Sequence, residues 1–334
     1  MSRLFFFALS LFASVQLGVQ ASTVRSEVSL LQRIDHASRT LNYSGLYVYQ
    51  QGSSVSSTRI THMVDKGQSI EKLEILDGKV HEIIRVNDDI TTYAPHSKTV
   101  THHKRLQADQ FPALFLGDSA EWQEVYTLKR GVDERIAGLD CEQISLEPKD
   151  GLRYGYRLWA DKKSGLLVRA QTLNEKGELL DQTSFSEIKI NLPFDRNKVQ
   201  ASWPSTVTQA WKQERVETQQ AQWQQEGWQF KNLPSGFRKA LEVRRPHLLQ
   251  DAPSTSRVTQ STTGQVLFSD GLASASIFIE PYVEGQHQPD TLRAVGATHM
   301  LAKRVADFWI VVVGDVPAET IRKLASAVDY KAIK

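Results

Sequence analysis

The stretch TRITHMVDKGQSIEKLEILDGKVHEIIRVNDDITTY, Thr58–Tyr93, decides the fold of the first half of the chain. Apolar and polar residues alternate along it with a period of two, the spacing of a strand with one buried face. Asp77-Gly78 separates two of these runs. We expect it to form a two-residue hairpin turn, because both positions of such a turn need positive φ. The stretch therefore predicts an antiparallel meander with one apolar and one solvated face.

The same pattern extends to both sides of this stretch. We expect some ten antiparallel strands, over residues 46–51, 58–64, 69–76, 79–86, 90–93, 124–132, 135–147, 152–160, 166–173 and 179–190. Residues 24–41 carry apolar side chains every three or four positions, which predicts an amphipathic helix. The fold class is therefore α+β, with a large antiparallel half-barrel packed on a helix.

A second, smaller α+β domain is expected at the C-terminal end. Residues 200–225 are rich in glutamine and carry three tryptophans, which indicates a part-helical linker whose tryptophans dock onto either domain. Beyond it, residues 308–313 are typical of a buried strand, and Pro317 suits the first position of a helix reaching Val328. The predicted boundaries are 22–199 for the large domain, 200–225 for the linker and 226–334 for the small domain.

Residues 1–21 are expected to be a secretory signal peptide. A basic start at Arg3 precedes an apolar run that is shorter than the roughly 20 residues a membrane-spanning helix needs. Small residues before position 22 indicate cleavage after Ala21, so we expect a mature protein exported to the periplasm. The only cysteine is Cys141, which excludes an intrachain disulfide and fits a buried strand position, an intermolecular disulfide being the alternative. The formal net charge of +2 gives no indication of nucleic-acid binding.

No catalytic set emerges from the sequence. Nucleotide-binding loops, a serine elbow and a His-Glu-x-x-His zinc motif are all missing from it. His102 and His103 are adjacent, so in a strand they point to opposite faces and do not chelate one metal together. We therefore expect no catalytic residues, no cofactor and no metal, and interpret the histidines as surface side chains.

Two features suit binding. Phe111–Leu116 is a compact apolar stretch, interpreted either as part of the core or as a movable cover over an apolar cavity. We predict lipid contact at Phe111, Leu114, Phe115 and Trp122. A basic cluster further on is either a solvated face or a surface for an acidic partner, and with one later histidine it makes up the predicted partner-binding set of Arg238, Lys239, Arg244, Arg245 and His299.

Several motifs resemble the RseB/MucB family in order and spacing. They occupy residues 42–50 (NYSGLYVYQ), 156–167 (YRLWADKKSGLL), 268–274 (FSDGLAS), 276–279 (SIFI), 296–299 (GATH) and 312–317 (VVGDVP). Together with the leader, the length and the linker, the resemblance covers nearly the whole chain. It implies a large domain like the lipoprotein carriers LolA and LolB.

The resemblance also implies a function. Family members are periplasmic regulators that bind the periplasmic part of a transmembrane anti-sigma factor, RseA or MucA, and protect it from regulated proteolysis. Binding of lipid or lipopolysaccharide acyl chains in the large domain releases the anti-sigma factor, and the small domain is the one that chiefly binds the anti-sigma factor. The site residues above come from composition and pattern and are not carried over from the family. A lipid or lipoprotein carrier is the alternative function, an enzyme acting on envelope glycolipids is a third, and the sequence leaves a homo-oligomer open.

Overall fold

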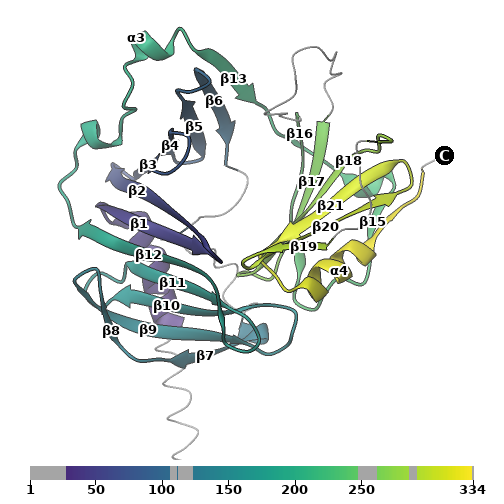
Figure 1. Ribbon diagram of the computed structural model, residues 1–334, viewed down its shortest axis with the longest axis horizontal. Helices are drawn as coiled ribbons and strands as arrows, with labels where there is room; N and C mark the ends of the chain where they lie inside the picture. Colours follow the sequence, from purple (N-terminus) through teal and green to yellow (C-terminus); the bar gives the residue numbers. More distant parts are fainter. Residues whose placement is uncertain (1–27, 106–110, 112–122, 247–261, 286–291, 333–334) are drawn as a thin grey trace, which may run out of the picture.

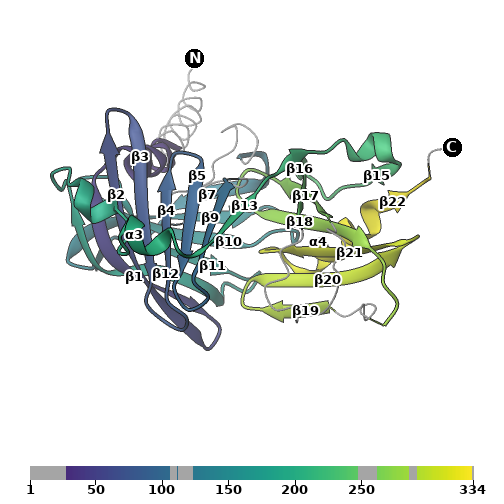
Figure 2. The same cartoon turned by 90° about the horizontal axis from the view of Figure 1, so that it is seen from above.

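The computed structural model describes residues 28–105, 111, 123–246, 262–285 and 292–332. Two lobes lie side by side, each built on its own antiparallel sheet, and a long connection passes from one to the other (Figure 1). Seen from above, the strands of the two sheets occupy opposite halves of an elongated molecule (Figure 2). None of the helices among the described residues is long and apolar enough to cross a membrane.

The N-terminal lobe is a thirteen-stranded sheet with the order β13-β6-β5-β4-β3-β2-β1-β12-β11-β10-β9-β7 and β8 paired to β9. Its strands are β1 (Tyr43–Gln51), β2 (Ser54–Asp65), β3 (Gln68–Ile75), β4 (His81–Val86), β5 (Asp89–Ala94), β6 (Thr99–Lys104), β7 (Tyr126–Arg130), β8 (Glu134–Ile136), β9 (Leu139–Pro148), β10 (Gly155–Asp161), β11 (Leu167–Leu173), β12 (Leu179–Ile190) and β13 (Lys212–Val216). Among the strands of the described residues, only β13 and β6 pair in parallel. Over the described residues the order does not return to its start, so the sheet is open and the predicted antiparallel half-barrel is confirmed.

A helix described over residues 28–40 packs on one face of this sheet, here called the inner face. Leu31 and Ile34 have no exposed surface and contact buried side chains such as Ile144 and Leu167. The apolar periodicity of the sequence therefore predicted this helix and its buried side. Its predicted start at Val24 lies outside the described residues.

The connection between the lobes runs over the other, outer face of the sheet. It contains η1 (Arg196–Val199) and α3 (Ser205–Thr208), and Val199 packs on Met63 and Ile70 of the outer face. The Lys72 ammonium lies 3.0 Å from Glu82 and donates to the Ser202 hydroxyl at 2.8 Å. Strand β13 then joins the N-terminal sheet, and three residues later β14 (Gln219–Gln220) pairs with a strand of the other lobe.

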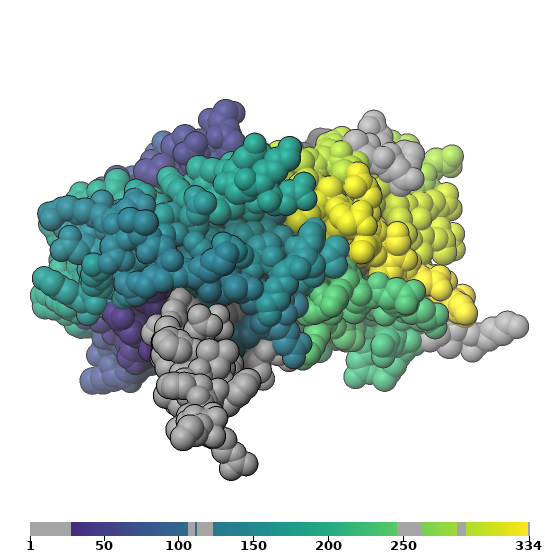
Figure 3. Space-filling model, turned by 90° about the horizontal axis from the view of Figure 1, so that it is seen from below, coloured from purple at the N-terminus to yellow at the C-terminus, as the bar shows by residue number. Residues whose placement is uncertain are grey.

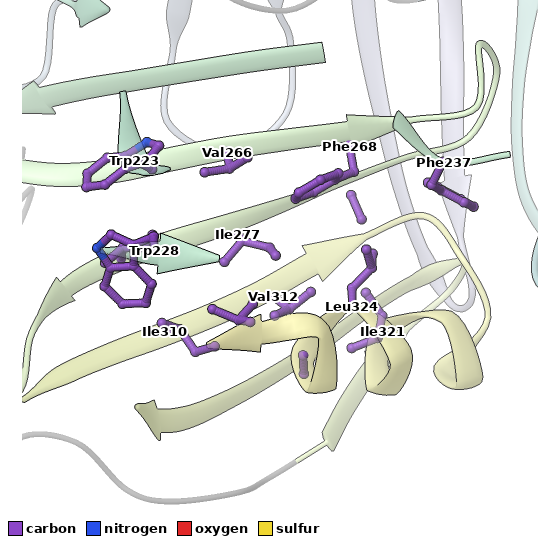
Figure 4. Packing of buried hydrophobic residues seen from close by; sticks show 14 of the residues in the cluster. Trp223, Trp228, Phe237, Val266, Phe268, Ile277, Ile310, Val312, Ile321 and Leu324 are labelled. Carbon is purple, nitrogen blue, oxygen red and sulfur yellow. The ribbon is translucent and has the colours of Figure 1, made fainter. Parts of the chain in front are cut away.

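The C-terminal lobe contains a seven-stranded sheet with the order β14-β16-β17-β18-β21-β20-β19. Its remaining elements are η2 (Trp223–Glu226), β15 (Trp228–Phe230), β16 (Arg238–Pro246), β17 (Thr262–Ser269), β18 (Ser274–Pro281), β19 (Leu292–Val295), β20 (Thr298–Val305), β21 (Phe308–Gly314), α4 (Ala318–Ala327) and β22 (Val328–Tyr330). Helix α4 covers one face, and its Ile321 and Leu324 pack with Val312 and Phe268 (Figure 4). Trp223 and Trp228 belong to the same core, whereas the rings of Trp203 and Trp211 in the connection contact each other at a tilt, with centroids 5.7 Å apart.

Several strands were missed because their sequences are polar or short. Strand β6 reads TVTHHK and buries only Val100, while β16 was noticed only as a basic cluster. Strands β19 and β20 carry no fully buried residue, so the apolar alternation that marks a strand is weak there. All four take their place from pairing with neighbouring strands rather than from burial of their own side chains.

Two local predictions were wrong. Asp77-Gly78 is not a two-residue turn: β3 ends at Ile75, β4 begins at His81, and of the pair only Gly78 has positive φ. Asp77 instead accepts a hydrogen bond from the backbone N–H of Ser57. The tight turn lies at Lys66-Gly67, where both residues have positive φ. Pro317, with ψ of 151°, is the N-cap of α4 and not its first helical residue.

Candidate functional site

An aromatic cluster of Tyr47, Phe111 and Phe185 lies on the inner face of the N-terminal sheet. Tyr47 and Phe185 face each other across paired strands β1 and β12, with ring centroids 5.9 Å apart. Phe111 packs against both rings, at 5.5 Å from Tyr47 and 5.1 Å from Phe185. Burial raises the pKa of Tyr47. This cluster forms an apolar wall of the kind that ligand pockets use.

A charged row borders the aromatic cluster on the same face. The Arg85 guanidinium lies 2.6 Å from the Glu71 carboxylate, and both side chains are mostly buried. His103 follows on β6, because Arg85 and His103 both pair with Ile90 of β5. Burial lowers the pKa of His103, and the positive charges of Arg85 and of Arg245 from the C-terminal lobe lower it further. Arg245 of the C-terminal lobe is therefore within electrostatic reach of this row.

Arg153 connects the lobes through a fully buried side chain, just before β10. Its Nε lies 2.8 Å from Oδ2 of Asp270, whose side chain is also fully buried. Neither atom makes an aligned hydrogen bond, so the contact is an ion pair. The guanidinium also donates to the backbone carbonyl of Ser235 and lies over the rings of Tyr126 and Phe237. Burial raises the pKa of Asp270.

Further polar contacts extend this junction. The Asp181 carboxylate accepts from the backbone N–H of Ala297 at 3.2 Å, and Gln51 donates to the Thr298 hydroxyl at 3.3 Å. Burial raises the pKa of Asp181. Thr320 of α4 donates to the carbonyl of Leu152, and the space-filling view shows this C-terminal segment in contact with the N-terminal lobe (Figure 3).

His299 belongs to the same junction. Its Nδ1 lies 3.2 Å from the Tyr154 hydroxyl and 3.0 Å from the carbonyl oxygen of Val316. The residue predicted to touch a partner therefore contacts the N-terminal lobe through Tyr154. His62 is also not the surface side chain that we expected: it is 3 % exposed and stacks on Tyr43.

The predicted basic cluster does not form one surface. Strand alternation places neighbouring residues of β16 on opposite faces. Arg244 lies over Trp223 of the core and beside Glu226, whereas Arg245 lies over Phe278 on the other face. Lys239 is paired with Glu242 at 2.6 Å. Arg238 occupies the start of the strand and is exposed.

Of the predicted lipid-contacting residues, only Phe111 is among the described residues. It packs in the aromatic cluster and touches both inner-face cores, while Leu114, Phe115 and Trp122 lie outside the described residues. The sequence did not indicate the junction residues Arg153, Asp181 and Asp270. Nothing in their local pattern distinguishes them from ordinary strand and turn residues, because their partners come from the other lobe.

Metal binding is not supported by the part of the chain that the structure describes. There, no three histidine, cysteine or acidic residues approach closely enough to hold a metal ion. Cys141 is fully buried, and burial raises the pKa of its thiol to about 11. The arrangement instead offers apolar and charged binding surfaces between two coupled lobes.

Comparisons with known proteins assign these two lobes. Residues 26–203 match the MucB/RseB N-terminal domain, and residues 222–329 match the MucB/RseB C-terminal domain. The sigma factor AlgU regulatory protein MucB of Pseudomonas aeruginosa is 27 % identical over 321 residues, covering 95 % of each chain. The sigma-E factor regulatory protein RseB of Escherichia coli K12 is 26 % identical over 328 residues, covering 98 % of each chain.

A solved structure agrees with the sequence matches. MucB in complex with MucA(peri) superposes with a TM-score of 0.69 at 26 % identity, covering 92 % of this chain and 100 % of that one. Because both domain matches lie in the same order as the two lobes and together span most of the residues, this chain belongs to the MucB/RseB family.

Proposed function

We propose that this protein is a periplasmic regulator of an envelope-stress sigma factor and not an enzyme. It binds the periplasmic part of a transmembrane anti-sigma factor and protects that segment from proteolysis. The observation that carries the proposal is the similarity, over nearly the whole chain, to regulatory proteins of sigma factors and to MucB in its complex with MucA(peri).

The same proposal includes export and domain organisation. Residues 1–21 act as a leader, 22–199 form the large domain, 200–225 the linker and 226–334 the small domain. Contact with the anti-sigma segment is assigned to the small domain, with Arg238 and Lys239 on its exposed part. His299 supports the interface indirectly, through its hydrogen bonds at the domain junction.

Lipid acts as the releasing signal in this proposal. An acyl chain lies against the aromatic cluster of Tyr47, Phe111 and Phe185, whose rings line the inner face of the open sheet. A ligand can weaken partner binding only if its affinity differs between the partner-bound and partner-free protein. The cluster lies on the same face as the charged row of Glu71, Arg85 and His103, which is near Arg245 of the second lobe. A bound acyl chain can therefore affect the second lobe through this row.

The test is a titration of the mature protein with the periplasmic segment of its anti-sigma factor, with and without lipopolysaccharide. We expect saturable binding that the lipid reverses. Phe111→Ala should leave binding of the anti-sigma segment in the absence of lipid unchanged. It should weaken the release by lipid, because it removes the ring that contacts both Tyr47 and Phe185. Phe194→Ala is the matched control, since that ring is 39 % exposed and outside the cluster.

Each alternative outcome identifies another function. Lipid uptake without binding of the anti-sigma segment at micromolar concentration would contradict the regulator proposal and favour a lipid or lipoprotein carrier. Release that proceeds equally well in Phe111→Ala would move the acyl site away from the aromatic cluster. Turnover of a glycolipid would revive an enzymatic function.

A further inference from the structure

A cleft of about 310 Å³ lies on the C-terminal sheet, on the face opposite helix α4. Its lining includes Arg245, Gln265, Ser276, Phe278, Thr298 and Asp315. The core side chains Val266, Ile277 and Val312 alternate along the same strands and point the other way. Two polar residues of this lining, Gln265 and Ser276, are buried, and a buried polar group is costly unless its hydrogen bonds are made.

Arg245 carries an uncompensated positive charge at one end of this cleft. Its guanidinium lies 5.4 Å from the centroid of the Phe278 ring, and burial alone lowers its pKa. Among the described residues it has no carboxylate partner, whereas the adjacent Arg244 is paired with Glu226. A partly desolvated cation without a counterion is costly, and an oxyanion would remove that cost.

Gln265 supplies a second unmet polar group in the same cleft. It is 6 % exposed, and its Nε2 donates to the Ser276 hydroxyl at 3.0 Å. Its Oε1 has no hydrogen-bond partner among the residues that the structure describes. If the amide were turned over, Oε1 would accept from Ser276 and the amino group would be left unpaired. In either orientation, one polar atom beside Arg245 lacks a partner.

The N-terminal lobe faces both ends of the cleft. At one end His103 experiences the charges of Arg85 and Arg245, and Arg85 is already paired with Glu71. At the other end Thr298 accepts from Gln51 and donates to Asp315 at 2.6 Å. A ligand in the cleft therefore contacts the small domain while lying beside the inner face of the large one.

The charge of the cleft is asymmetric, which places an anion at one end only. Asp315 has no basic partner among the described residues and would repel an anion. Arg245 lies over Phe278, whereas Asp315 lies near the Ser274 end of β18, because Ala275 pairs with Gly314. Phe278 and Ser274 are four residues apart on this strand, or about 13 Å at the usual rise of a strand. An anion at Arg245 is therefore well separated from the Asp315 carboxylate, and hydroxyls of the cleft lie in between.

We propose that this cleft binds the phosphate of an amphiphile headgroup, held by Arg245, with Gln265 and Ser276 bonded to polar groups of the same headgroup. A guanidinium matches phosphate with paired N–H donors. A peptide is disfavoured, because a sheet face offers no free backbone groups to pair with an extended chain. The proposal rests on the lipid-sensing function above and extends the ligand from the large domain to the small one.

The test measures binding of lysophosphatidylglycerol to the mature chain by calorimetry. Arg245→Gln should weaken it about 10-fold or more, since hydrogen bonds to charged groups contribute about 1.5–3 kcal/mol and each 1.4 kcal/mol is tenfold. Arg244→Gln makes the same charge change on the same strand and should leave the affinity unchanged. A monoacylglycerol, which lacks phosphate, should bind the wild type and Arg245→Gln equally.

An NMR titration of His103 gives an independent readout. Removing the nearby positive charge in Arg245→Gln should raise the His103 pKa without ligand, and lysophosphatidylglycerol should raise it in the wild type only. Equal weakening by both arginine variants would indicate general attraction and overturn the proposal. So would inorganic phosphate binding as tightly as the lipid, or an acidic anti-sigma peptide that needs Arg245 while the lipid does not.

These measurements distinguish failure of the lipid-sensing function from failure of the proposed headgroup site. If neither amphiphile binds the wild type, the lipid-sensing function fails. If both amphiphiles bind and Arg245→Gln has no effect on either, the function stands and the headgroup site is wrong. Phe111→Ala should weaken both amphiphiles, because its ring contacts the acyl chain that they share.

Discussion

Replacing Arg153 with methionine should destabilise the protein by about 3–5 kcal/mol, the usual cost of removing one partner of a buried ion pair. The side chain of Asp270 stays fully buried after the change, and its Oδ2 loses the guanidinium that lay 2.8 Å away. Its Oδ1 keeps two backbone donors, the N–H groups of Leu272 and Ala273. The penalty is large beside a total stability of about 5–15 kcal/mol.

The loss should depend on pH in a defined direction. Burial raises the folded-state pKa of Asp270 above its ordinary 3.8. Such a group contributes stability that is present below the unfolded-state pKa and is lost as pH rises through the folded-state pKa. Without Arg153 the folded-state pKa rises further, so the carboxyl is protonated at higher pH. The destabilisation by Arg153→Met should therefore be greatest at neutral pH and shrink on acidification.

Equilibrium unfolding in urea, followed by tryptophan fluorescence at neutral and mildly acidic pH, measures both effects. Arg157→Met is the matched control, because Arg157 lies four residues away on β10, is exposed and should change stability by less than about 0.5 kcal/mol. A neutral-pH loss below about 1 kcal/mol for Arg153→Met, or an equal loss at both pH values, would refute the role given to the ion pair.

Three further predictions concern other contacts. Gly296→Ala should cost about 1–3 kcal/mol more than Gly285→Ala in thermal unfolding, because a Cβ at Gly296 would lie 2.0 Å from Asp181 Oδ1, whereas Gly285 also has a positive φ but open space around it. Cys141 should resist a thiol reagent in the native protein at mildly alkaline pH and react fully in urea, because burial raises its pKa to about 11; rapid native labelling would contradict this. Lys72→Met should cost about 3 kcal/mol, since Glu82 stays buried without its ammonium partner, but it should not speed proteolysis within residues 200–211, because Ser202 keeps two hydrogen bonds to Glu82; faster cleavage there would contradict this.

The sequence predicted those parts of the fold whose own side chains are buried. The spacing of apolar residues such as Leu31 and Ile34 predicted the helix, and the alternation in β2 and β3 predicted the sheet. Each pattern shows which face of the element is buried. Polar strands such as β6 and β16 were missed because their place depends on pairing with neighbouring strands. The turn predicted at Asp77-Gly78 was wrong for a similar reason, since Asp77 accepts a hydrogen bond from the backbone N–H of Ser57 on the neighbouring strand.

The candidate site was predicted less well, because it is made where two lobes meet. Arg245 was recognised as basic but grouped with Arg244, although alternation along β16 separates them. Arg153 and Asp270 lie more than a hundred positions apart, and a charged residue between two strands gives no sign that its partner is in another domain. Phe111 was found from composition alone, since an apolar stretch between charged regions is visible without knowing what it packs against.

The strength of the junction limits how a ligand can act on it. Allosteric couplings are typically 1–3 kcal/mol, whereas separating the lobes would break five hydrogen bonds across the junction, worth about 1 kcal/mol each, together with the Arg153–Asp270 contact. Full separation of the lobes would also strain the connection, because only Glu217 and Thr218 lie between β13, paired in one sheet, and β14, paired in the other. One bound lipid cannot supply that energy. We therefore expect the lobes to stay joined at Arg153 and the ligand to act through a smaller change on the side of the cleft, where the contacts of Gln51 and Asp181 are single hydrogen bonds worth about 1 kcal/mol each.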